Sequence, residues 1–190
     1  QFIRLEDRAY DRNNPRVVYG ADTGVSRLIP DDETGRLTRF SSSNPDGLTG
    51  MADNGRIYRF ELSKRDPRKV VSFTVLADGD ADPKSPYYVD MTSPDNIDTS
   101  KWSLMVQEDT GEAKILRHDF GSGAWSTVAT VNDPSGESSG IVDASAWFGP
   151  GYWMLTVQAH GSNNAEQVVS EELTLKREDG QLLLISVPGS

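Results

Sequence analysis

The sequence predicts an all-β fold built like a β-propeller, and two observations lead to this prediction. Helical periodicity is almost absent, and short apolar or alternating runs are separated by clusters of Gly, Pro, Asp, Asn and Ser, which is typical of strands joined by turns. A unit of successive strands also recurs along the chain with loops of different length, as in propeller blades. We expect about three to four blades in residues 1–190, whereas propellers close with about four to eight.

The first strand of each expected unit is an apolar run that stops at polar groups followed by Gly. These runs are RVVYGADTG at 16–24, WSLMVQEDTG at 102–111 and YWMLTVQAHG at 152–161. A second strand follows in each unit, at 55–62, 113–120 and 180–187. A third strand is clear in two units, at 70–77 and 125–131. Residues 25–54 and 162–179 are expected to be long loop insertions in a single propeller segment that spans the chain.

The polar ends of these first strands are the best candidates for a shared site. In a propeller the first strand of each blade lines the central channel, so its end points to the channel mouth. Asp22, Glu108, Asp109 and His160 would then be equivalent positions on successive blades. The segment SPDNIDTSK before the middle run is expected to form a turn rich in oxygen acceptors, including Asp95 and Asn96.

Converging carboxylates point to a hard cation, because like charges held together are costly unless a positive charge lies between them. Ca²⁺ binds about six to eight oxygen atoms from carboxylates, amides and carbonyls. The candidate ligands are Glu6, Asp22, Asp95, Asn96, Glu108, Asp109 and Glu137, with His160 as a further candidate. Solvated strand ends without any metal explain the same residues, and the sequence leaves both interpretations open.

The acidic segment at 78–83, the histidine at 118 and the four tryptophans are expected to have structural roles. DGDADP at 78–83 places Asp at alternate positions, but it lacks the Gly and the final Glu of an EF-hand loop, so we interpret it as an acidic turn. His118 is expected at a surface or an edge. The tryptophans Trp102, Trp125, Trp147 and Trp153 are expected to pack inside and between blades. No phosphate-binding loop, dinucleotide fingerprint, zinc spacing or nucleophile elbow is present.

Composition excludes several classes of function. The formal net charge of −10 argues against unaided nucleic-acid binding, which requires a basic surface. No apolar run approaches the roughly 20 residues of a membrane-spanning helix. The absence of cysteine excludes disulfides, thiolate metal sites and cysteine nucleophiles.

Three segments together resemble the PhoX-type family of secreted bacterial phosphatases. FIRLEDRAYD resembles the family's R-x-E-D segment, and SPDNIDTSKWSLMVQED resembles its P-D-N…L-x-x-x-E-D segment. ESSGIVDASAWFGPGYWMLTVQAHG resembles its E-x-x-G…L-x-V-x-Q stretch. The segments occur in the family's order and span most of residues 2–161.

The resemblance implies a six-bladed propeller whose channel holds calcium and iron ions that serve the hydrolysis of phosphate monoesters. It implies that Glu6 and Glu108 are metal ligands, that Asp22 is a further one, and that Glu137 approaches the channel. Asp95 and Asn96 would shape the turn above the site. Ca²⁺ and Fe³⁺ are therefore the expected cofactors, a phosphate ester the expected substrate, and the periplasm or the extracellular space the expected location.

The chain also departs from the family pattern. The family's N-terminal half, with further metal ligands, has no counterpart here, and the strand leading to Glu108 carries no Arg or Lys to hold phosphate. We therefore expect the C-terminal portion of such a phosphoesterase, inactive as an isolated half. The other part of the ring, or another copy of the chain, would complete it. The alternative is a non-catalytic propeller segment with a structural or binding role that assembles through open blade edges.

Overall fold

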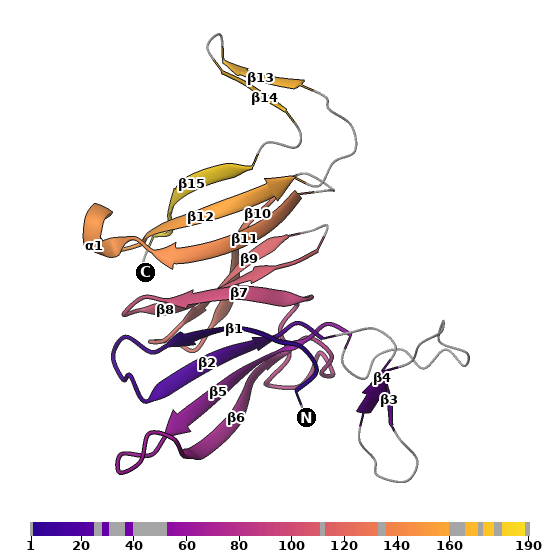
Figure 1. Ribbon diagram of the computed structural model, residues 1–190, viewed down its shortest axis with the longest axis vertical. Coiled ribbons are helices and arrows are strands. Elements are labelled where there is room, and N and C mark those ends of the chain that lie inside the picture. Colours follow the sequence, from indigo (N-terminus) through magenta and orange to yellow (C-terminus); the bar gives the residue numbers. More distant parts are fainter. Residues whose placement is uncertain are drawn as a thin grey trace. The chain divides into compact units, whose positions relative to one another are not determined.

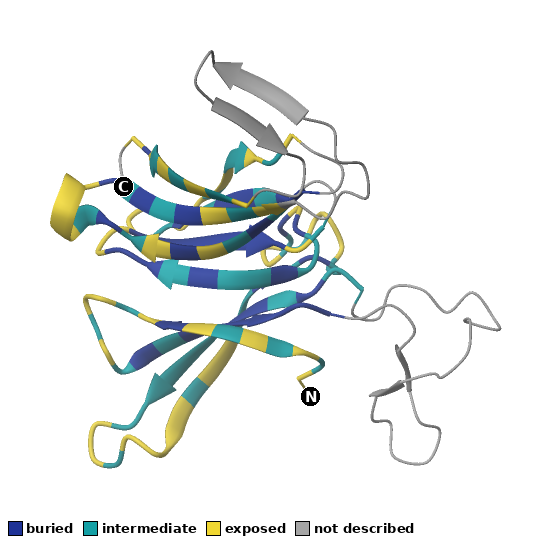
Figure 2. Ribbon diagram, turned by 45° about the horizontal axis from the view of Figure 1, so that its top comes forward, coloured by how far each residue is buried: buried dark blue, intermediate teal, exposed yellow. Residues whose placement is uncertain are grey.

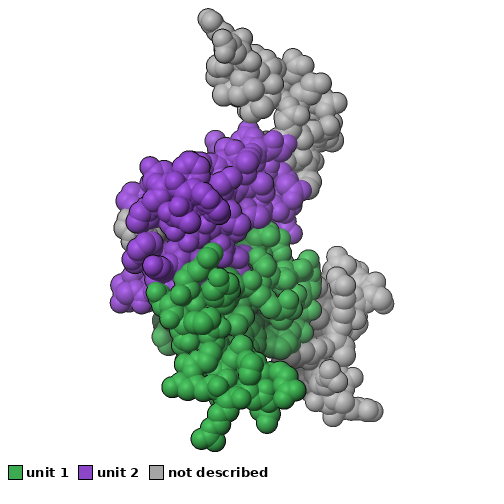
Figure 3. Space-filling model, turned by 60° about the vertical axis from the view of Figure 1, so that its left-hand side comes forward, with its two compact units in different colours: residues 1–96 green, residues 97–190 purple. Residues whose placement is uncertain are grey.

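The computed structural model of the protein describes residues 2–24, 28–30, 37–39, 53–110, 113–132, 136–159, 166–170, 173–176 and 180–188. Its described strands pair antiparallel in three larger sheets and two short hairpins (Figure 1). The chain divides into two compact units, residues 1–96 and residues 97–190 (Figure 3). The boundary falls within strand β7 (Pro94–Thr99), which is a member of the second sheet.

The first sheet has the strand order β1-β2-β5-β6. Its strands are β1 (Leu5–Tyr10), β2 (Val17–Asp22), β5 (Arg56–Leu62) and β6 (Val70–Asp78). Period-two alternation in β2 and β5 places the buried Tyr19 and Ile57 on one face. The other face carries an aromatic cluster in which the Phe60 and Phe73 rings, paired across β5 and β6, lie 5.1 Å apart.

The second sheet has the order β10-β9-β8-β7 and contains the most deeply buried strand. Besides β7, its strands are β8 (Ser103–Glu108), β9 (Lys114–Asp119) and β10 (Trp125–Thr130). All six residues of β8 are buried (Figure 2). A strand covered on both faces requires a nearly continuous apolar run, and this explains why β8 is so easily recognised in the sequence.

The third sheet has the order β11-β12-β15 and packs on the second sheet. Its strands are β11 (Gly136–Asp143), β12 (Tyr152–Ala159) and β15 (Gln181–Ser186), and a single-turn helix α1 (Ser145–Phe148) joins β11 to β12. The core between the two sheets is formed by Met105, Ile115, Ile141, Trp153, Leu155 and Val187. This core belongs entirely to the second unit.

Two short hairpins lie within the segments expected to be loop insertions. β3 (Leu28–Pro30) pairs with β4 (Leu37–Arg39), and β13 (Glu166–Ser170) pairs with β14 (Leu173–Lys176). Most other residues of 25–54 and 162–179 lie outside the described part of the chain.

In each of the three larger sheets, another strand precedes the strand that the sequence predicted to be the first. β1, β7 and β11 each form one edge of their sheet, so β2, β8 and β12 are second strands and do not form that edge. The segment around Asp95 is accordingly a strand, and its interpretation as a turn was wrong. The reason is composition: PDNIDT holds one large apolar side chain, Ile97, so no apolar run or alternation marks it as a strand.

His118 is buried, and its expected position at a surface or an edge was wrong. It lies on β9, an interior strand, where its ring stacks on Trp125 at 4.7 Å between ring centroids. Trp153 is fully buried in the core as expected, whereas Trp147 on α1 is 74% exposed and does not pack in a blade. Burial lowers the pKa of His118 below its ordinary value of 6.5.

The lowered pKa of His118 predicts a loss of stability in mild acid. Below pH 6.5 the unfolded chain binds a proton at His118 that the folded chain still excludes. The free energy of unfolding therefore falls as the pH decreases through this window, until His118 is protonated in the folded state as well. His118→Phe, which retains an aromatic ring beside Trp125, should flatten this part of the profile in denaturant titrations. An unchanged slope between wild type and variant would contradict the assignment.

Candidate metal centre

The first strand of each of the three larger sheets carries an acidic side chain at its second position. Glu6, Asp95 and Glu137 are the second residues of β1, β7 and β11. The predicted sequence repeat began with the strands that follow these three, so it did not reveal that Glu6, Asp95 and Glu137 occupy equivalent positions. The signal that could have revealed it is the similar start of LEDRAY, PDNIDT and GESSGIVD, each with an acid after its first residue.

Two of these acids meet a third carboxylate at one end of the second sheet. Asp95 on β7, Asp109 directly after β8, and Glu137 on β11 each place one carboxylate oxygen within 4.8 Å of the others. Asp109 is exposed, and the other two are partly buried. β7 is the neighbour of β8 in the sheet, and β11 lies against β8, so three strands supply the acidic triad.

Hydrogen bonds beside the acidic triad hold its strands in place. Gln107, fully buried on β8, donates from its side-chain amide to the hydroxyl of Ser138, also fully buried on β11. Glu137 directly precedes Ser138 in the chain. This bond therefore fixes the start of β11, with Glu137, against the end of β8. Asn96 donates from Nδ2 to Oδ2 of Asp95 over 3.0 Å and thereby orients that carboxylate.

The donor set of the acidic triad fits a hard cation. Ca²⁺ lies about 2.4 Å from each oxygen it binds, so two of its ligand oxygens are separated by at most about 4.8 Å. The oxygens of Asp95, Asp109 and Glu137 satisfy this limit. Three carboxylates this close repel one another, and a cation between them would remove that repulsion.

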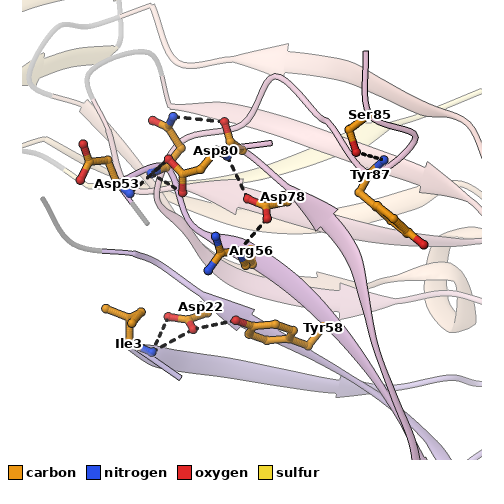
Figure 4. A network of polar contacts seen from close by, with 11 residues as sticks. Ile3, Asp22, Asp53, Arg56, Tyr58, Asp78, Asp80, Ser85 and Tyr87 are labelled. Carbon is orange, nitrogen blue, oxygen red and sulfur yellow. Dashed lines mark hydrogen bonds and ion pairs between the residues drawn. The ribbon is translucent and has the colours of Figure 1, made fainter. Parts of the chain in front are cut away.

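Asp22, a predicted ligand, has a structural role in the first unit. It is buried at the end of β2, where its carboxylate accepts the backbone N–H of Arg4 over 2.7 Å and that of Ile3 over 3.0 Å. It also accepts the hydroxyl of Tyr58 over 3.3 Å (Figure 4). Burial, followed by the charge of Asp22, raises the pKa of Tyr58. These contacts attach the N-terminal segment to the first sheet.

The remaining predicted ligands lie outside the acidic triad. Glu6 forms an ion pair with Arg4 over 3.0 Å on the surface of β1. Glu108 is fully buried at the end of β8, and its Oε2 accepts the backbone N–H of Lys114 over 3.1 Å. Asn96 donates a hydrogen bond to the carboxylate of Asp95 and is not itself one of the three converging groups. His160 lies outside the described residues. The structure thus brings together three of the seven predicted carboxylate and amide ligands.

The DGDADP segment forms a turn whose acidic side chains accept hydrogen bonds and form an ion pair inside the first unit. Asp80 accepts the backbone N–H groups of Asp53 and Asn54 over 3.1 and 3.0 Å, and Asp78 forms an ion pair with Arg56 over 2.7 Å (Figure 4). Burial raises the pKa of Asp80 in spite of these donors. The arrangement agrees with an acidic turn that closes the end of the first sheet.

Comparisons with known proteins identify the fold. No family model matches the sequence, and no curated protein matches it. The chain is similar to the solved structure of Pseudomonas fluorescens PhoX in complex with vanadate, a transition state analogue, with a TM-score of 0.65 and 16% sequence identity. That match covers 98% of this chain and 34% of the PhoX chain. A crystal structure of a nidogen/laminin complex gives a TM-score of 0.39 and 18% identity, covering 94% of this chain and 64% of that one.

The chain therefore spans about one third of the length of the PhoX structure. At this level of identity the similarity shows the fold alone. The expected all-β, propeller-like architecture is confirmed by the three antiparallel sheets and by this match. No helix in the described part of the chain is long and apolar enough to cross a membrane.

Proposed function

We propose that the protein is part of a cation-dependent phosphoesterase of the PhoX type, and that Asp95, Asp109 and Glu137 hold the cation. The single observation that carries the proposal is that one carboxylate oxygen each from Asp95 on β7, Asp109 directly after β8 and Glu137 on β11 lie within 4.8 Å of one another. The PhoX-like fold supports it, because it makes a phosphoryl compound the first ligand class to test. Ca²⁺ suits this donor set. Bound Fe³⁺ is a further prediction, and elemental analysis of the purified protein would test it.

The chemistry follows from the ligand type. A cation bound by the acidic triad would polarise a phosphoryl oxygen and neutralise the charge that develops on it. Asp95, oriented by Asn96, and Glu137, positioned beside the Gln107–Ser138 bond, would present their carboxylates with little reorganisation. The exposure of Asp109 would leave one side of the centre accessible to substrate. Because the chain spans about one third of PhoX, we assign hydrolysis to an assembly with further blades and expect cation binding from the chain itself.

Calcium binding by the acidic triad is tested first. Elemental analysis of protein purified without chelator should find bound calcium, and calorimetric titration of chelator-treated protein should show binding at one site. Asp109→Asn should weaken binding at least about tenfold, since the charge count of the ligands sets Ca²⁺ affinity. Glu6→Gln, which removes a predicted ligand outside the triad, should leave the affinity unchanged. Absence of binding, or equal losses in both variants, would contradict the proposed centre.

A second experiment tests the phosphoryl ligand. Inorganic phosphate or vanadate should raise the midpoint of thermal unfolding only when Ca²⁺ is present, and this dependence should disappear in Asp109→Asn. Stabilisation by phosphate without Ca²⁺ would indicate an anion site elsewhere on the protein. Binding of Ca²⁺ without any effect of phosphate would favour the non-catalytic alternative for this chain.

A further inference from the structure

Two turns lie side by side at one end of the first sheet. Residues 11–16 join β1 to β2, and residues 63–69 join β5 to β6. β2 pairs with β5, and the backbone N–H of Leu62 donates to the carbonyl oxygen of Arg16 over 2.8 Å. The two turns are therefore neighbours (Figure 1), although about 50 residues of chain separate them. The opposite end of β2 carries Asp22.

These turns concentrate positive charge in a chain that is acidic as a whole. Their sequences, DRNNPR and SKRDPRK, contain six basic and two acidic residues, a formal charge of +4, whereas the whole chain has −10. We call this surface the basic tip, and its basic residues are Arg12, Arg16, Lys64, Arg65, Arg68 and Lys69. Arg16 is partly buried, and the other five are exposed. Pairing of β2 with β5 thus builds a basic surface that the overall composition conceals.

Both acids of the basic tip take part in shaping its turns. Asp11 accepts two backbone N–H groups of its own turn, over 2.7 and 3.2 Å. Asp66 pairs with Arg68 over 2.9 Å and with Lys69 over 4.0 Å, and it also accepts the backbone N–H of Arg68. The side chains of Arg68 and Lys69 nevertheless remain 88% and 75% exposed. The acids therefore hold the turns while the basic groups still face the solvent.

Exposed apolar side chains border the basic tip. Tyr10, the last residue of β1, is 51% exposed, and the guanidinium of Arg12 lies 5.4 Å from the centroid of its ring. Val70 and Val71, the first residues of β6, are 52% and 63% exposed. Basic groups beside an aromatic ring and aliphatic side chains suit a membrane interface, where cations meet anionic headgroups and apolar groups enter the headgroup region. A nucleic-acid duplex offers similar phosphates but would leave the two valines without a role.

We propose that the basic tip binds the surface of a membrane that contains anionic lipids. The attraction acts over about 8 Å, the Debye length at physiological ionic strength. A strand of six residues is about 20 Å long, so acids at the opposite end of the first sheet, such as Asp22 and Asp78, are screened from a surface that the tip contacts. The negative net charge of the chain therefore does not prevent binding. The proposal does not rest on the cation site, because the acidic triad shares no residue with the basic tip.

Sedimentation with lipid vesicles tests the proposal. The wild-type chain should sediment with vesicles of phosphatidylglycerol and phosphatidylcholine, should stay in solution with vesicles of phosphatidylcholine alone, and should be released as the salt concentration rises. A chelator is present throughout, so that Ca²⁺ cannot bridge the acidic triad to the lipid. Failure to bind would overturn the proposal and would leave the proposed cation centre untouched.

Charge-matched variants locate the contact. Lys64→Gln combined with Arg65→Gln should weaken binding at least about tenfold, because each basic residue near an anionic surface strengthens binding about fivefold. Arg4→Gln combined with Lys84→Gln removes the same charge from two exposed residues at the far end of the first sheet, since Arg4 precedes β1 and Lys84 follows β6. This control should bind like the wild type. Equal losses in the two double variants would assign binding to net charge and contradict the basic tip.

Two further readouts separate a membrane from another polyanion. Val71→Ser should weaken vesicle binding by a factor that does not depend on salt, because it removes an apolar side chain from the interface. An affinity that Val71→Ser leaves unchanged would contradict the role of the apolar border. Binding to a short DNA duplex without binding to anionic vesicles would make the partner a nucleic acid and would overturn the membrane assignment.

Discussion

Trp153→Ala is expected to lower the free energy of unfolding by about 3–5 kcal/mol, the range for large aromatic truncations in a packed core. Trp153 is fully buried on β12 and lies in the cluster that joins the second and third sheets. Alanine would leave a cavity between two sheets whose strands are fixed by their own hydrogen-bond ladders, so the site cannot collapse to refill it. Denaturant titration measures the loss directly.

Two further variants control the Trp153 result. Trp147→Ala removes the same side chain from a position that is 74% exposed on α1 and should change the stability by less than about 0.5 kcal/mol. Trp153→Phe should cost less than alanine, because the indole Nε1 of Trp153 is buried without a hydrogen-bond partner among the described residues. A small loss in Trp153→Ala, comparable to that of Trp147→Ala, would show that the second and third sheets do not share this core.

Gly55→Ala is expected to be the second most damaging substitution, with a loss of about 2–5 kcal/mol. Gly55 has a φ of +84°, a conformation that costs an L-residue about 1–2 kcal/mol. A Cβ there would also lie 2.4 Å from the backbone oxygen of Asp22 and 2.7 Å from that of Thr23, and backbone atoms of a sheet cannot easily move away. The overpacking adds about 1–3 kcal/mol.

Gly123 offers the matched control for Gly55. Its φ is +73°, but a Cβ there would meet no atom within 4 Å. Gly123→Ala should therefore show the conformational cost alone, and the difference between the two variants measures the close approach at the start of β5. Equal losses in both would mean that the chain around Asp22 and Thr23 adjusts without cost.

Most strands could be predicted from the sequence because they are buried. β2, β5, β8, β9 and β12 carry apolar runs or alternation, and their order along the chain revealed the repeat. The first strands β1, β7 and β11 could not be recognised in the same way, since they hold few large apolar residues and their composition resembles that of turns. His118 was misplaced for a related reason. A histidine inside a strand gives no sign of the partner across it, and here Trp125 on β10 covers the ring.

The sequence predicted candidate ligands by residue type, but it did not indicate which of them lie close together. The resemblance to PhoX-type proteins singled out the segments that carry Glu6, Asp95, Glu108, Asp109 and Glu137, and nothing in their spacing indicates which side chains point the same way. Glu108 is the last residue of the buried strand β8, whereas Asp109 lies directly after the strand, so the two adjacent carboxylates have different surroundings. Glu108 is buried and accepts the backbone N–H of Lys114, whereas Asp109 is exposed beside Asp95 and Glu137.

The sequence by itself determined the all-β class, the repeating unit and the acidic character of the strand ends. These properties follow from local pattern, because burial of alternating or continuous apolar residues requires strands and the repeat requires similar sheets. Only the tertiary structure decided which acids converge and that β1, β7 and β11 each join the sheet of the strand that follows them. Those features depend on contacts between residues far apart in the chain.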